Sequence, residues 1–146
     1  IEQIKIANLF NLPLIVHTRE AEKDTIEILK KYATKNMKIH LHCFSDSIQM
    51  AKELIEYFPN CFLGFTGAVT FKNAKHTRLL VKIIPLNRIL LETDGPYMAP
   101  FPFRGKPAHA GYIPIIAKRI AQLKGIQNVE TVLKQTRINA KSMYGV

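Results

Sequence analysis

The sequence predicts an α/β fold built on a parallel sheet, and two observations support this. Short apolar runs alternate with amphipathic helical patterns along the 146 residues. The run Ile89-Leu90-Leu91 is continuously apolar, as is typical of a parallel strand that is buried on both faces. No linker, repeat or low-complexity tract interrupts the alternation, so residues 1–146 are expected to form one segment.

Each element is expected from its own apolar spacing and boundary residues. The chain opens on a helical pattern with apolar positions at Ile1, Ile4, Ala7 and Phe10. Strands are expected at residues 13–17, 38–44, 61–66 and 88–94. Helices are expected at residues 22–33, from 48 to 58, and at residues 74–84, 113–124 and 128–144. Ser45 or Ser47 caps the second of these helices, Asn128 caps the last, and Gly125 ends the one before it.

The strand count favours half of a (β/α)8 barrel. Four strands without partners would leave two exposed sheet edges, which promote unwanted pairing with other chains. The sequence also begins at Ile1, inside a helical pattern and without Met. Both features are expected if the other half of the barrel lies upstream. An open doubly wound sheet is the alternative.

Composition limits the environment of the chain. It is 47% hydrophobic and 22% charged, as in soluble globular proteins, and no apolar run reaches the roughly 20 residues of a membrane span. Cys43 and Cys61 match no paired zinc spacing and are expected to be free thiols, which favours a reducing compartment. We therefore expect an intracellular protein, cytoplasmic or nuclear, with no membrane or protein partner.

The net charge of +10 is large for this length and favours a polyanionic partner such as nucleic acid. The lysines are nevertheless spread along the chain and form no long block. A coating of solvated lysines on helices explains the same charge equally well.

Three polar residues end predicted strands. His17 ends the first and Asp94 the fourth, while His42 lies near the end of the second. Because the carboxyl ends of parallel strands meet at one mouth of a barrel, these side chains should converge there. Singly, each has a structural explanation as a core histidine or a turn former. Together, two imidazoles and a carboxylate predict a divalent metal site that activates water and neutralises a phosphate oxygen.

Five stretches together resemble the TatD family of metal-dependent deoxyribonucleases, which are single (β/α)8 barrels. They are PLIVHTREAEKDTIEIL, LHCFSDS, GAVTFKNA, RILLETDGPYMAP and FRGKPAH. The resemblance implies that this chain supplies the last four β/α units. It also implies that His17, His42 and Asp94 are metal ligands for one or two ions, Mg²⁺ or Mn²⁺, with Zn²⁺ as the alternative. The family's other ligands, a His-x-His pair after its first strand and a Glu after its fourth, have no counterpart here.

Other residues around these motifs are candidates for supporting roles. Glu92 precedes Asp94 by two and so shares its face; it is expected to hold a ligand histidine or, alternatively, the backbone. Arg19 can contact a phosphate or pair with an acid. The loop residues Arg104 and Lys106 are candidates for clamping a nucleic-acid backbone, or for plain solvation. His109, where many family members carry Asn-Glu-Pro, is a candidate substrate contact. His40 is expected to be structural and His76 to lie on the surface.

The function expected from the resemblance is metal-dependent hydrolysis of phosphodiester bonds in DNA, with a 3′-to-5′ exonuclease as the expected direction. His17 and His42 would coordinate the metal, and Asp94 would coordinate it and orient or deprotonate the attacking water. Two alternatives remain open. One is hydrolysis of a small amide or ester, and the other is a catalytically inactive scaffold that binds nucleic acid.

Overall fold

The computed structural model describes residues 1–146 and contains four strands and six α-helices. The strands are β1 (Leu14–Val16), β2 (Ile39–Leu41), β3 (Cys61–Phe65) and β4 (Ile89–Leu91). The α-helices are α1 (Glu2–Phe10), α2 (Glu22–Tyr32), α3 (Ile48–Tyr57), α4 (Lys75–Ile83), α5 (Ile113–Lys124) and α6 (Val129–Tyr144). Short 3-10 helices are η1 (Gly67–Thr70), η2 (Leu86–Arg88) and η3 (Ala110–Tyr112).

The four strands form one parallel sheet in the order β1-β2-β3-β4. The register pairs Ile15 with His40, His40 with Phe62, and Gly64 with Leu90. The predicted α/β class with a parallel sheet is therefore confirmed. The strand order follows the sequence without reversing, unlike the order of a doubly wound sheet.

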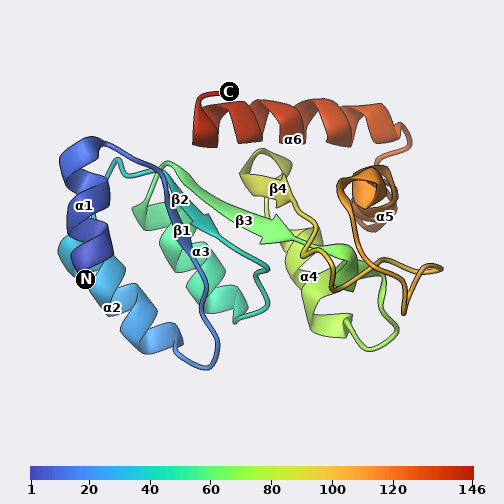
Figure 1. Cartoon of the computed structure of the whole chain (residues 1–146), viewed down its shortest axis with the longest axis horizontal. Helices are drawn as coiled ribbons and strands as arrows, with labels where there is room; N and C mark the ends of the chain where they lie inside the picture. Colours follow the sequence, from blue (N-terminus) through green and yellow to red (C-terminus); the bar gives the residue numbers. More distant parts are fainter.

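The main core lies on a single face of the sheet. Its 25 buried residues include Ile39, Leu63 and Ile89 from the strands, packed against apolar side chains of α2, α3, α4 and α5. Figure 1 shows α2, α3 and α4 along this side of the strands. Winding every crossover helix onto one face is the arrangement of a barrel wall. That these are the last four units of eight stays a prediction.

The opposite face carries a smaller apolar cluster and most of the polar side chains of interest. Phe62 and Leu90 pack there against Met143 of α6, which crosses this side of the sheet (Figure 1). Because side chains alternate along a strand, residues in register with Phe62 or Leu90 face the same way. His40 and Gly64 therefore share this face.

Element boundaries agree with the sequence to within a few residues. The strand expected at 88–94 is shorter in the structure, where β4 ends at Leu91. Its partner strand β3 ends at Phe65, which pairs with Leu91. One further ladder bond, from the Glu92 N–H to the Phe65 carbonyl at 3.1 Å, keeps the chain extended. Ser47, not Ser45, caps α3 by accepting from the Met50 N–H. Asn128 caps α6, and Gly125 ends α5 with φ of 68°.

Both cysteines are free thiols, as expected. Burial raises the pKa of Cys61 to about 12, so this thiol stays protonated and inert. None of the helices combines the length and the apolar character needed to cross a bilayer.

Asn139 of α6 provides a test of how the last helix is held against the sheet. Its buried amide donates to the carbonyls of Leu86 and Ile89, at 2.9 and 2.7 Å, where β4 begins. We expect Asn139→Ala to lower the free energy of unfolding by about 1–3 kcal/mol, because both carbonyls lose a partner. Urea denaturation measures the change.

The matched control is Arg137→Ala, an exposed position on the same helix, which should change stability by less than about 0.5 kcal/mol. An equal loss of unfolding free energy in the two variants would show that the Asn139 hydrogen bonds do not hold α6 against the sheet.

Candidate metal centre

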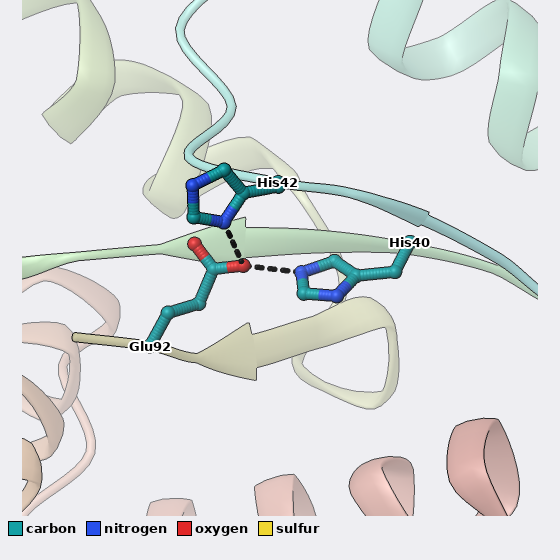
Figure 2. Close-up of side chains that lie close together, drawn as sticks. All are labelled: His40, His42 and Glu92. Carbon is teal, nitrogen blue, oxygen red and sulfur yellow. Dashed lines mark hydrogen bonds and ion pairs between the residues drawn. The ribbon is translucent and has the colours of Figure 1, made fainter. Parts of the chain in front are cut away.

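The imidazole of His42 lies between two carboxylates at the carboxyl end of the sheet. Its Nδ1 is 3.2 Å from Glu92 Oε1, and its Nε2 is 3.6 Å from Asp94 Oδ1. Figure 2 shows the Nδ1 side of this contact, with Glu92 reaching from the end of β4 towards His42 beyond β2. If Nδ1–H donates to Glu92, the Nε2 lone pair is directed to the side where Asp94 lies.

Glu92 is buried, with 8% of its surface exposed, and its oxygens are held by three groups. The Cys43 N–H donates to Oε2 at 2.9 Å. His42 Nδ1 and His40 Nε2 both face Oε1. Cys43 adopts φ of 49°, which is uncommon for a residue with a side chain. An ionised carboxylate tolerates burial only with such partners.

Space for this carboxylate is created by Gly64 of β3. A Cβ atom built on Gly64 would overlap Glu92 Oε1 and lie 2.5 Å from His40 Nε2. Glycine in a strand weakens it, and commonly marks a position that another group approaches closely. Here the approaching group is the Glu92 carboxylate, which crosses the middle of the sheet surface to reach β2.

His40 was expected to be structural only, and the structure places it in the cluster. Its Nε2 lies in close contact with Glu92 Oε1, without the alignment of a hydrogen bond, while its Nδ1 is 2.5 Å from the Tyr144 hydroxyl. Burial, and then the charge of Glu92, raise the pKa of Tyr144, so its protonated hydroxyl can donate to Nδ1. The His40-x-His42 spacing on one strand face was the sequence signal for this pairing.

Of the three predicted ligands, His42 lies near each of the other two. The His17 and His42 rings are 6.0 Å apart between centroids, and Asp94 lies on the Nε2 side of His42. All three follow strands and share the face of His40 by alternation. His17 is exposed, whereas Asp94 is partly buried.

The donor atoms present suit a divalent metal. His40, His42 and Glu92 each offer a ligand atom, all within 4.8 Å of one another, so this cluster is able to hold an ion. On the other side of the His42 ring, Nε2 and the Asp94 carboxylate form a further pair of donor groups. Two ligands of one ion, each about 2.1 Å from it, lie no more than about twice that distance apart. The 3.6 Å between His42 Nε2 and Asp94 Oδ1 meets this condition.

The thiol beside the cluster is a poor ligand. Burial is the largest of the effects that raise the pKa of Cys43, and the charges of Glu92 and Asp94 act in the same direction. A protonated thiol binds metal weakly, because the thiolate is the ligand form. The site therefore offers imidazole nitrogens and carboxylate oxygens.

Comparison with known proteins identifies the family. The model described as TatD related DNase matches residues 1–145. The chain belongs to this family. The metal-dependent hydrolase YabD of Bacillus subtilis (strain 168) is 40% identical over 144 residues, which cover 99% of this chain and 55% of YabD. The human 3'-5' RNA nuclease TATDN2 is 37% identical over 150 residues, covering 99% of this chain and 19% of TATDN2.

Solved structures agree with the family. YjjV, a TatD homologue from Escherichia coli K12, superposes with a TM-score of 0.88 at 26% identity, covering 99% of this chain and 54% of YjjV. A hydrolase of the TatD family from Entamoeba histolytica has the same fold, with a TM-score of 0.82 at 20% identity. The chain spans about half the length of YabD and of YjjV.

The remaining residues named from the TatD resemblance lie at the surface. Arg19 and Lys106 are exposed. The guanidinium carbon of Arg104 lies 3.8 Å from the centroid of the Phe71 ring. His109 Nδ1 accepts from the Gly111 N–H and its ring packs on Tyr112, so it caps η3. His76 is exposed, as expected, and contacts the Asp46 carbonyl.

Gly64→Ala tests the close approach of Glu92. We expect this variant to lose about 1–3 kcal/mol of unfolding free energy, because the added methyl group overpacks the carboxylate and the His40 ring. Urea denaturation of the single variant measures the loss. In a Glu92→Ala background, where the carboxylate is gone, the loss should shrink. Equal losses in the two backgrounds would show that Gly64 does not serve Glu92.

Proposed function

We propose that the protein hydrolyses phosphodiester bonds in DNA with a divalent metal held by His17, His42 and Asp94. The observation that carries the proposal is the placement of the His42 ring. One nitrogen faces the buried Glu92 and the other faces Asp94 at 3.6 Å. Histidines that bind metals in proteins almost always donate their second nitrogen to a carboxylate or carbonyl in this way.

Each group has a separate task in this proposal. Glu92 fixes the tautomer and orientation of His42, so that Nε2 presents its lone pair to the ion. Asp94, less buried than Glu92, contributes an oxygen and orients or deprotonates the attacking water. A divalent ion bound there, Mg²⁺ or Mn²⁺ with Zn²⁺ as the alternative, would acidify a water molecule and neutralise charge on the phosphate.

His40, His42 and Glu92 form the cluster whose donor atoms lie within 4.8 Å of one another. We assign His40 and Glu92 of this cluster a supporting role. Glu92 Oε2 already accepts the Cys43 N–H, and Oε1 already faces two imidazoles. His17 and Asp94, on the other side of His42, are more exposed than His40 and Glu92, which suits a site that a substrate must reach.

The proposed substrate is a polyanion. The chain has a net charge of +10, and Arg19, Arg104, Lys106 and His109 are the proposed phosphate contacts. Digestion from the 3′ end of DNA is the proposed direction. The name of TATDN2, a 3'-5' RNA nuclease, makes RNA the rival polymer to be compared with DNA.

Asp94→Asn tests the catalytic assignment in the full-length protein. We expect the rate of nucleotide release from 3′-end-labelled linear DNA in Mg²⁺ or Mn²⁺ to fall roughly 10²–10⁴-fold, because the amide cannot accept a proton. A chelator should abolish release from the unchanged protein. Asp24→Asn, an exposed carboxylate on α2, is the matched control and should keep the full rate.

The outcomes separate the rival functions. An Asp94→Asn protein that digests DNA at the full rate would refute the assignment. Hydrolysis of p-nitrophenyl acetate without release of nucleotides would favour the small-ester hydrolase. DNA binding that survives metal removal, without hydrolysis under any condition, would favour the inactive scaffold.

Glu92→Gln tests the supporting role of the buried carboxylate. Because a neutral amide in place of this carboxylate would orient His42 less well, we expect the affinity for Mn²⁺ to fall about 10- to 100-fold. Titration followed by electron paramagnetic resonance measures the free ion. Glu130→Gln, in the first turn of α6, is the control and should bind as the unchanged protein does. An unchanged affinity in Glu92→Gln would remove Glu92 from the site.

A further inference from the structure

A groove runs along the surface between the segment 70–74 and the loop 96–107. Two of its hollows share a wall made by Phe71 and Arg104. A third hollow adjoins the first across Thr70 and Phe101. The Phe101 N–H donates to Thr70 Oγ1 at 2.8 Å, so the two segments are tied together. We call these three hollows the aromatic groove.

The aromatic groove begins beside the metal centre and leads away from it. The hollow nearest to the metal centre is lined by Tyr97 and Met98. The Sδ atom of Met98 is 3.7 Å from Sγ of Cys43, the residue after His42. The hollow beside Thr70 and Phe101 that lies farthest along the groove is lined by Lys118 and Arg119 of α5. A chain molecule with one end at the metal centre could therefore continue along this surface.

The charge of this part of the chain is strongly one-sided. Residues 57–129 contain ten Lys and Arg but two Asp and Glu, namely Glu92 and Asp94, and so carry +8 of the net +10. The groove itself is lined by basic residues without a carboxylate: Lys72, Arg104, Lys106, Lys118 and Arg119. None of these five forms an ion pair with an acid of the chain. Free positive charges of this kind complement a phosphate backbone.

Aromatic faces accompany the charges. Tyr97 is 70% exposed and Phe101 is 64% exposed, so neither ring serves mainly to pack the loop onto the sheet. The Arg104 guanidinium lies over the Phe71 ring. This flat, positively charged group is a further surface on which a base can stack. Rings beside a basic groove stack on unpaired bases, whereas the bases of a duplex are already stacked on one another.

We propose that the aromatic groove binds the single-stranded part of the nucleic acid whose end lies at the metal centre. Bases would stack on Tyr97 and Phe101, and phosphates would contact Arg104 and the basic residues towards α5. The identification of the bound strand as substrate rests on the proposed function. The binding itself does not require hydrolysis.

Fluorescence anisotropy of the full-length protein tests the proposal. The probe is a labelled thymidine strand about 12 nucleotides long, in chelator so that nothing is cleaved. Phe101→Ala should weaken binding roughly 5- to 150-fold through loss of stacking. Arg104→Ala should weaken it and reduce the slope of log affinity against log salt by about 0.7, the contribution of one phosphate contact.

Leu79→Ala on α4 and Arg137→Ala on α6 are matched controls at exposed positions outside the groove, and both should bind as the unchanged protein does. Circular dichroism verifies that each variant is folded. The proposal is overturned if both groove variants keep full affinity and salt slope, or if a fully paired duplex binds as tightly as the single strand. If the protein shows this pattern of binding but never releases nucleotides, the proposed groove stands and the proposed nuclease function fails.

Discussion

The buried carboxylate of Glu92 is the constraint on which the arrangement of the site depends. A carboxylate with so little exposure needs protein groups to replace the water that it loses, and His42 Nδ1 and the Cys43 N–H do so by hydrogen bonds. The Cys43 N–H donates to one oxygen of this carboxylate, and Gly64 leaves the space that a side chain would fill. The same carboxylate holds the ring of His42. The stability of the fold and the proposed metal site therefore depend on the same cluster of side chains.

The two faces of the sheet differ in what they hold. One face packs the main core, mostly against α2 to α5, and the other holds the polar site and the small cluster with Met143 of α6. Figure 1 shows α6 on that side. Charge is divided along the chain as well, since residues 57–129 carry most of the positive excess. The proposed nuclease activity and the proposed groove draw on that same excess.

Periodicity and caps predicted the elements well, because apolar spacing and residues such as Ser47, Asn128 and Gly125 act locally. The parallel order followed from the βαβ alternation. His17, His42 and Asp94 were expected to converge from their strand positions, and in the structure His42 lies near both His17 and Asp94. His40 and Gly64 were missed as members of the site, because their roles depend on the register between β2, β3 and β4. The Phe71–Arg104 contact joins two distant loops, which no local pattern reveals.

An anomalous difference map from crystals of the full-length protein grown with Mn²⁺ tests the central claim most directly. We predict a peak bounded by His17, by Nε2 of His42 and by Asp94, with Glu92 hydrogen-bonded to Nδ1 behind the ring. A peak among His40, His42 Nδ1 and Glu92, with none beside Asp94, would contradict the assignment and make Glu92 a ligand.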